Sequence, residues 1–345
     1  MKVDLFDFDL PEDRIAQRPA EPRDAARLLH VAATGLTDRS IADLPDLLSP
    51  GDLLVLNDTR VLPARLIGRR GAATVSVTLH QQIGSDTWRV FAKPAKRLRI
   101  GYDLVFAPDF SARVLDKPET GDVVLRFDRG AAELLVALHA HGAIPLPPYI
   151  RGGIADERDG SDYQTMFARV EGAVAAPTAA LHFTEALMRR LTDRRIGLAT
   201  VTLHVGAGTF LPVKVDDTDQ HVMHAETGFV SSEAAQAINA AKAAGGRIVA
   251  VGTTSLRLIE SAATADGTVQ PFAGDTKLFI TPGYRFRTID RLMTNFHLPK
   301  STLFMLVAAF AGLPRMRSAY AHAVAAGYRF YSYGDSSLLE REEAP

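Results

Sequence analysis

The sequence predicts an α/β protein in which a large mixed α/β domain carries an inserted small β-barrel domain. From about residue 161 the chain alternates short apolar runs with helical segments, a pattern typical of parallel strands with covering helices. Between about residues 65 and 128 it holds several short strand-like runs that glycine and proline interrupt, which indicates a small barrel or sandwich. We therefore expect a discontinuous large domain of residues 1–64 and 151–345 and an inserted barrel domain of residues 65–150.

The composition is that of a globular protein without thiol chemistry. Of 345 residues, 47% are hydrophobic and 23% are charged, which is enough for a substantial core. The net charge of −1 excludes a globally basic nucleic-acid binder but allows local basic patches. The absence of cysteine excludes disulfides, a thiolate nucleophile and cysteine-bound metal.

The sequence shows no export or membrane signal. Residues 1–8 are acidic and lack an apolar signal core. The most apolar stretch, residues 303–313, is shorter than the roughly 20 residues that a bilayer crossing needs. We expect a cytoplasmic protein that contacts no membrane.

The first half of the chain contains one clear buried strand, three barrel strands and a helix. The continuous apolar run at residues 53–56 is typical of a strand buried on both faces. We predict barrel strands at residues 74–79, 88–91 and 122–127. A helix is predicted at residues 131–141, ended by Gly142.

The second half contains helices with recognisable N-caps and strands that lead into polar loops. Thr184, Ser301 and Ser318 are expected to cap helices at residues 185–191, 303–311 and about 319–326, respectively. Ser231 or Ser232 is expected to cap an alanine-rich helix that runs to Gly245-Gly246. Strands are expected at residues 196–205, 248–251 and 278–280, and each leads into a loop rich in glycine or threonine.

Polar clusters lie at several of these predicted strand ends. They are Asn57-Asp58-Thr59-Arg60, Gly206-Ala207-Gly208-Thr209, Gly252-Thr253-Thr254-Ser255 and Thr281-Pro282-Gly283-Tyr284. In open α/β sheets, ligands bind beyond the carboxyl ends of the strands. We therefore expect one shared site there, which His182 joins from the start of a helix.

Two of the clusters have specific alternatives. Gly206 and Gly208 lack the third glycine of a dinucleotide-binding loop, because Leu211 takes its place, so a tight turn near another ligand or a plain turn is favoured. Thr253 and Thr254 open a helix whose free N–H groups favour an anion, to which Arg257 would add a bidentate contact. A simple threonine cap explains the same residues equally well.

Two charged runs also allow more than one interpretation. His221, His224 and Glu226 have spacing compatible with metal ligands, but no HExxH motif or third ligand accompanies them, so a substrate-binding or acid–base role is favoured over metal or a solvated loop. Lys93, Lys96, Arg97 and Arg99 form the densest basic run, which suits phosphate contacts or a charged edge strand.

Taken together, the segments resemble the S-adenosylmethionine:tRNA ribosyltransferase-isomerase family of queuosine biosynthesis nearly end to end. The resemblance rests on residues 7–11, 56–61, 172–179, 181–184, 202–210, 251–255, 295–303 and 328–335. The sequence departs from the family pattern at Thr281, where tyrosine is usual, at Ala225, where serine is usual, and at Thr227-Gly228, where aromatic residues are usual.

The resemblance implies an α/β domain with an inserted barrel, and a specific reaction. The ribosyl part of S-adenosylmethionine (AdoMet) would be transferred and isomerised onto 7-aminomethyl-7-deazaguanine at the tRNA wobble position. Epoxyqueuosine would form, with release of adenine and methionine. AdoMet would be a consumed substrate, and no cofactor or metal is expected.

With this reaction in view, we predict three groups of site residues. The catalytic group is His182, His204, His221, His224, Glu226 and His297. The substrate-binding group is Asn57, Asp58, Arg60, Gly206, Gly208, Thr253, Thr254, Arg257 and Asn295. The tRNA-binding group is Lys93, Lys96, Arg97 and Arg99.

Two other functions compete with this interpretation. An AdoMet-dependent RNA methyltransferase would suit the glycines after a strand, but the strand ending at Val251 lacks the acidic residue expected for a ribose hydroxyl. A non-catalytic RNA-binding protein would explain the basic run but not the polar clusters at several strand ends.

Overall fold

The computed structural model describes residues 1–118, 121–206, 208 and 213–342. In this part of the chain, nine strands form one mixed sheet in the order β15-β13-β12-β3-β14-β16-β17-β1-β2. Their bounds are β1 Arg27–Ala32, β2 Gly35–Ser40, β3 Leu53–Asn57, β12 Gly197–Leu203, β13 Glu226–Val230, β14 Ile248–Val251, β15 Phe272–Thr276, β16 Arg291–Asn295 and β17 Ser336–Glu340. The four central strands β12, β3, β14 and β16 are parallel.

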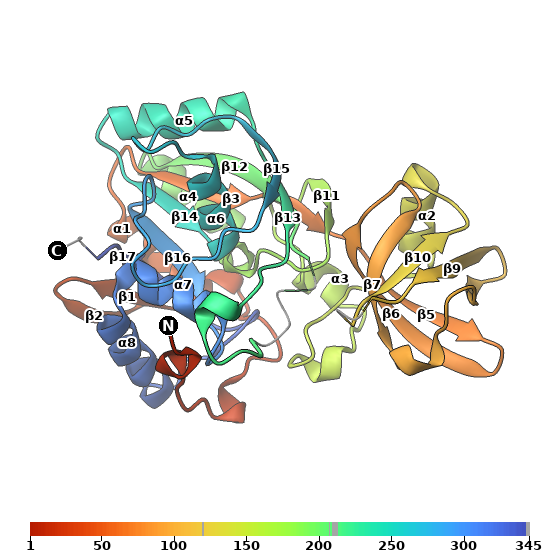
Figure 1. Ribbon diagram of the computed structural model, residues 1–345. Helices are drawn as coiled ribbons and strands as arrows, with labels where there is room; N and C mark the ends of the chain where they lie inside the picture. The colour runs from red at the N-terminus through yellow and green to blue at the C-terminus, as the bar shows by residue number, and fades with distance from the viewer. Residues whose placement is uncertain (119–120, 207, 209–212, 343–345) are drawn as a thin grey trace.

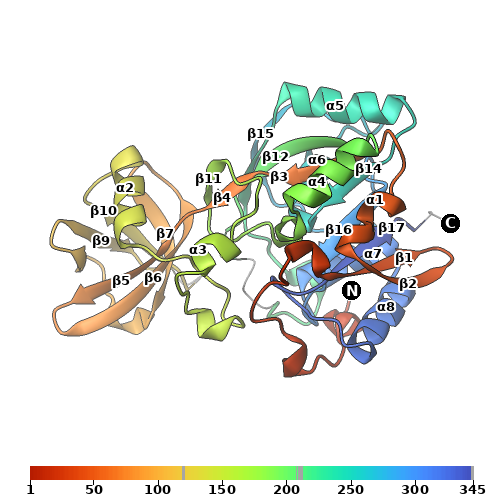
Figure 2. The same ribbon diagram turned by 180° about the vertical axis from the view of Figure 1, so that it is seen from behind.

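Helices cover both faces of this sheet, as Figures 1 and 2 show from opposite sides. The bounds are α1 Leu44–Leu47, α4 Glu185–Asp193, α5 Ser232–Ala243, α6 Thr253–Ala262, α7 Thr302–Ala311 and α8 Leu313–Ala325. Val55 of the buried strand β3 packs in the same core as α5 to α8, whereas Leu54 and Leu56 pack with α1 and α4. The alternation of side chains along a strand explains this division, because successive residues point to opposite faces.

A closed barrel of six strands lies beside the sheet within the described part of residues 65–127. Its strands are β5 Arg65–Arg70, β6 Ala73–Gln82, β7 Thr87–Lys93, β8 Asp103–Ala107, β9 Phe110–Asp116 and β10 Val123–Phe127. Helix α2 (Ala131–His141) packs onto the barrel core through Leu134 and Leu138. The predicted fold class is therefore confirmed, while the exact domain boundaries stay a prediction.

Short elements connect the nine-stranded sheet to the barrel. Strand β4 (Thr59–Val61) continues the chain from β3 and pairs in parallel with β11 (Val170–Ala173). In Figure 1, β11 and α3 (Asp159–Asp162) lie between the barrel on the right and the helices of the sheet on the left.

Most local predictions agree with the structure. The side chains of Thr184, Ser231 and Ser301 accept hydrogen bonds from the backbone N–H three residues later, which confirms these three N-caps. The cap predicted at Ser318 is wrong, because α8 already begins at Leu313 and the Ser318 hydroxyl donates to the Pro314 carbonyl inside the helix.

The strand predicted at residues 278–280 is also wrong. This segment has no regular structure, and the Arg257 side chain, not a neighbouring strand, binds the Leu278 carbonyl. The sheet instead uses β15 and β16, which the sequence pattern did not reveal. None of the helices in the described part of the chain combines the length and apolar character that crossing a bilayer requires.

Candidate active site

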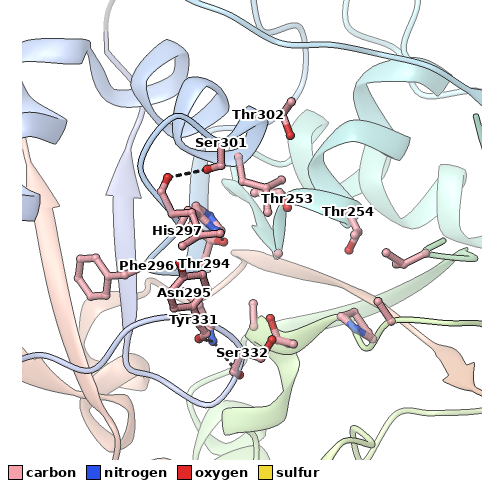
Figure 3. Close-up of a pocket in the computed structure, with 18 of the residues that line it drawn as sticks. Thr253, Thr254, Thr294, Asn295, Phe296, His297, Ser301, Thr302, Tyr331 and Ser332 are labelled. Atoms are coloured by element: carbon pink, nitrogen blue, oxygen red, sulfur yellow. Dashed lines mark hydrogen bonds between the residues drawn. The ribbon is translucent and has the colours of Figure 1, made fainter. Parts of the chain in front are cut away.

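A cavity of about 520 Å³ lies beyond the carboxyl ends of β14 and β16, and we call it the sheet cavity. Its wall comes from the loops after these strands and from residues 175–179 and 331–332. Figure 3 shows Thr253, Asn295, His297 and Tyr331 around it. Of the four polar clusters expected to share one site, only Gly252-Thr253-Thr254 belongs to the described lining of this cavity. The cavity does lie at the carboxyl ends of parallel strands, where ligands bind in such sheets.

Asn295 is fixed in the wall of the sheet cavity by His182. The His182 Nε2 atom lies 3.1 Å from the Asn295 Oδ1 atom, and the Asn295 amide donates to the carbonyls of Tyr331 and Ser332 at 3.0 and 3.1 Å. Complete burial lowers the pKa of His182 to about 4. His182 is therefore neutral at pH 7 and holds Asn295 from behind, and its predicted part in proton transfer stays a prediction.

His297 lines the sheet cavity directly. Its Nε2 atom lies 3.2 Å from the Thr294 hydroxyl, and its backbone N–H donates to the Tyr320 hydroxyl at 3.0 Å. Burial lowers the pKa of His297 to about 3, so this ring is also neutral at pH 7.

Acidification is expected to destabilise the protein through these two histidines. Their folded pKa values lie below the 6.5 of an unfolded histidine, so the stability they contribute is complete above pH 6.5 and is lost as pH falls toward 4. Between pH 7 and pH 5 each should lower the free energy of unfolding by about 2 kcal/mol, measured by urea denaturation. His182→Gln should lose about 2 kcal/mol less than the wild type over this interval. Equal losses would contradict a neutral His182.

The N-terminus of α6 also faces the sheet cavity. Gly252, Thr253 and Thr254 line it, and Gly252 adopts a φ of 91° at the point where the strand turns into the helix. The buried Thr254 hydroxyl has no hydrogen-bond partner among the described residues. An unpaired hydroxyl beside free helix N–H groups provides donors for an anion.

A second cavity of about 740 Å³ lies where the barrel meets the sheet, and we call it the junction cavity. Barrel residues His80 and Trp88, helix α2 and the segment His204-Val205-Gly206 line it. Val205 lines the sheet cavity as well. The two cavities are therefore neighbours that share one wall.

His204 stands at this shared wall. Its Nδ1 atom lies 2.9 Å from the Thr59 hydroxyl, which fixes the orientation of the ring. Burial lowers the pKa of His204, and the nearby Asp58 carboxylate opposes this effect. The ring occupies space that Gly172 leaves open, since a Cβ at Gly172 would lie 2.6 Å from it.

Asn57 and Asp58 support the His204 loop instead of lining a cavity. The Asn57 side chain accepts from Leu203 N at 3.0 Å and donates to Leu203 O at 2.9 Å. Asp58 accepts from the Thr202 hydroxyl at 2.6 Å and from Arg169 at 2.7 Å. Both are buried, and neither belongs to the described lining of the two cavities. Their polar atoms bind the chain itself, which gives both residues a supporting role, and the substrate contact predicted for them stays a prediction.

Glu226 and Arg257 form a buried ion pair. Glu226 lines the junction cavity and also accepts from the Gly206 N–H at 3.3 Å. Arg257 lies outside the described lining of the sheet cavity and donates through Nε to the Leu278 carbonyl at 2.9 Å. Its Nη2 atom has no partner among the described residues, so the anion contact predicted for Arg257 stays a prediction. This pair fixes Gly206 in the wall of the junction cavity.

The remaining predicted residues lie outside the described lining of both cavities. Arg60 is exposed, His221 packs against Phe279, and His224 meets the edge of the His80 ring with centroids 5.2 Å apart. Gly208 leaves room for His224, since a Cβ at position 208 would lie 2.8 Å from the His224 ring.

Ala207, Thr209 and Leu211 lie outside the described residues. In the ranges described, no group of three or more histidine, aspartate or glutamate side chains is arranged to hold a metal ion.

The predicted tRNA-binding residues form an exposed group at the end of β7 and in the turn that follows. Lys93, Lys96, Arg97 and Arg99 are all exposed. In the antiparallel register of β6 and β7, Lys93 lies opposite Ser76, whereas Trp88, beside the junction cavity, lies opposite Gln82. The basic group therefore lies at the opposite end of the β6–β7 pair from that cavity, roughly 17 Å along the strand.

Sequence reasoning missed His80, Trp88 and Gly172 as site residues. His80 and Trp88 belong to barrel strands, and only the docking of the barrel against residues 204–206 brings them to a cavity. The positive φ of Gly172, 150°, has no signal in a single sequence beyond the glycine itself.

The sheet with its cavity at the strand ends, together with the docked barrel, defines a two-part α/β enzyme. The family described as "Queuosine biosynthesis protein" matches residues 3–339, and the chain belongs to this family. It is 63% identical over 345 residues, covering 100% of both chains, to the S-adenosylmethionine:tRNA ribosyltransferase-isomerase of Rhodospirillum rubrum. The protein of the same name from Methylobacterium radiotolerans is 62% identical, with 98% of both chains covered.

A solved structure supports the same assignment. The crystal structure of S-adenosylmethionine tRNA ribosyltransferase from Thermotoga maritima is 34% identical. It matches 97% of this chain and 99% of its own, with a TM-score of 0.56.

Proposed function

We propose that this protein transfers and isomerises the ribosyl moiety of AdoMet onto 7-aminomethyl-7-deazaguanine at the wobble position of tRNA. The products are epoxyqueuosine, adenine and methionine. The names of the full-length relatives support this reaction. The observation that carries it is that two cavities share the wall at Val205, with His204 beside it, because a transfer between two large substrates needs adjoining sites. A tRNA-modifying role also favours the cytoplasm as its location.

The sheet cavity suits AdoMet, which is a substrate here and not a cofactor. The donors at the start of α6 would hold the methionine carboxylate. The rings of Tyr149 and Tyr331 stack with centroids 4.1 Å apart, and both line the cavity. Such aromatic faces attract a cation like the sulfonium. Asp7, at the rim, provides a carboxylate for the methionine ammonium.

The reaction begins with the removal of a proton from a carbon atom of AdoMet. The sulfonium of AdoMet acidifies the C–H bonds at the ribose 5′ carbon, and removal of this proton starts the expulsion of adenine. The neutral aminomethyl nitrogen of the tRNA base then attacks carbon. His204 is our candidate for the proton acceptor, because it borders the wall where the two substrates must meet, and its lowered pKa keeps it neutral at pH 7.

His182 and His297 act differently in this proposal. Both are neutral and strongly buried, so they are weak bases, and their contacts hold Asn295 and the Thr294 turn in place. In this proposal AdoMet is a consumed substrate, and we expect no metal or cofactor.

The exposed basic group of the barrel is proposed to bind tRNA phosphates. Lys96→Glu with Arg97→Glu should weaken tRNA binding and reduce the slope of log affinity against log salt by about 2, because each cation that contacts a phosphate contributes about 0.9 to it. The measurement is filter binding at several salt concentrations.

The matched control for this pair is Arg189→Glu with Arg190→Glu, an adjacent exposed pair on α4. This variant should leave the slope unchanged. If the barrel variant also kept the wild-type slope, the phosphates would be bound elsewhere.

The deciding experiment for the reaction is incubation with AdoMet and a tRNA carrying the modified base. Mass analysis should find adenine, methionine and a ribosylated base. Release of S-adenosylhomocysteine would show methyl transfer instead. Binding of tRNA without consumption of AdoMet would show a non-catalytic RNA-binding protein.

A further inference from the structure

The junction cavity contains buried hydrogen-bonding atoms that the protein itself does not use. His80 and Trp88 line it and are 8% and 5% exposed. The His80 Nδ1 and Trp88 Nε1 atoms are buried and have no hydrogen-bond partner among the described residues. Buried polar atoms without partners are unfavourable and rare, so their presence on a cavity wall indicates a ligand that pairs with them.

The remainder of this cavity suits a flat ring with polar groups at its edges. Leu62 and the α2 residues Leu134, Leu135 and Leu138 provide aliphatic walls. The volume of about 740 Å³ is large enough for a nucleoside. His80 is held rigidly, because its ring stacks on Phe91 with centroids 4.7 Å apart. Aliphatic walls beside polar side chains such as Gln81, Gln82 and Glu171 are typical of base recognition, because a base is flat and carries hydrogen-bonding groups only at its edges.

A carboxylate at the same cavity distinguishes between kinds of base. Glu171 of β11 lines the cavity, keeps 32% of its side chain exposed and pairs through Oε1 with His139 at 3.0 Å. A carboxylate accepts hydrogen bonds. A guanine-type base offers two adjacent donors, the ring N–H and the exocyclic amine, whereas the corresponding edge of adenine offers a donor and an acceptor. Glu171 therefore favours a guanine-type base.

We propose that the junction cavity binds a guanine-type base turned out of an RNA strand, with Glu171 on its donor edge and with Trp88 and His80 on its remaining polar atoms. This inference rests on the proposed function, in which the bound base is the modified base at the wobble position of the tRNA. Its aminomethyl group then points toward Val205 and the sheet cavity. Extruding a base into a closed pocket is the usual solution when chemistry takes place on the base itself.

The test compares binding of two tRNAs, one with the modified base and one with an abasic wobble nucleotide. The wild type should bind the modified tRNA more tightly. Trp88→Phe, which keeps an aromatic ring but removes the indole N–H, and Glu171→Gln should each reduce this preference about 10-fold. Glu133→Gln, on the exposed face of α2, is the matched control and should keep it. Thermal unfolding establishes that each variant is folded.

Turnover separates this inference from the proposed function. Trp88→Phe and Glu171→Gln should raise KM for tRNA and leave KM for AdoMet unchanged. A raised KM for AdoMet with an unchanged preference between the tRNAs would place adenine in the junction cavity and overturn the inference. A preference that survives in both folded variants would overturn it as well. A wild type that releases no adenine would contradict the proposed function, while the binding comparison would still test the cavity.

Discussion

Replacing His204 with alanine is expected to lower turnover by about 10²- to 10⁴-fold, the usual contribution of a positioned general base. The reason is its location at the wall shared by the two cavities, with the ring oriented by Thr59. Binding of tRNA should remain, because the substitution leaves intact both the basic group and the side chains proposed to contact the base, namely His80, Trp88 and Glu171. Single-turnover release of adenine measures the effect, and the loss should appear in kcat and not in KM.

Hydrogen exchange separates a base from a residue that only shapes the cavity. In deuterated water the wild type should exchange the 5′ hydrogens of bound AdoMet, and His204→Ala should not. The folded pKa of His204 is lowered, so the neutral, proton-accepting form persists below pH 6.5 and exchange should decline only under that value. His322→Ala removes a half-buried histidine that is paired with Asp38 and lies outside the described lining of both cavities, and this variant should exchange normally. Normal exchange in His204→Ala would exclude His204 as the base.

The sequence predicts those features of the fold that depend on neighbours in the chain. Thr184, Ser231 and Ser301 cap their helices through the N–H three residues later, so the local pattern is sufficient. The edge strand β15 was missed because Gly274 interrupts it and its pairing with β13 depends on residues about 45 positions away. Burial on two faces, in contrast, made β3 visible as an apolar run.

The sequence predicted where a site would lie, at the ends of the parallel strands, but not which side chain would have which role in it. The predicted cluster after β14 lines the sheet cavity, but the loop after β16 joins it in place of the cluster at residues 281–284, because β16 was not predicted. The role of Asn57 depends on a pairing with Leu203, 146 residues away, that engages both the oxygen and the nitrogen of its amide. His80 becomes a site residue only because the barrel docks near Gly206, which no spacing in the chain reveals.

Replacing Gly172 with alanine is expected to lower kcat by about 10²-fold with the fold retained, because a displacement of about 1 Å in a reacting group has that effect. The added Cβ would lie 2.6 Å from both Cε1 and Nδ1 of His204, so the ring must move away from Thr59. The substitution also places alanine at a φ of 150°, which should cost about 1–3 kcal/mol of stability. Urea denaturation and single-turnover adenine release measure the two effects separately.

Gly274→Ala is the matched control, because Gly274 has a similar φ of 159° but its nearest neighbour to an added Cβ is the Phe272 ring at 3.9 Å. It should carry a comparable backbone strain and keep normal kcat. If both variants lost the same activity, backbone strain and not the displacement of His204 would be the cause. Normal kcat in Gly172→Ala, together with a loss in His204→Ala, would contradict the prediction. The His204 ring would then be needed for turnover, but its exact position would not matter, unlike that of a positioned base. The pair of glycines therefore tests whether the orientation of His204, and not merely its presence, sets the rate.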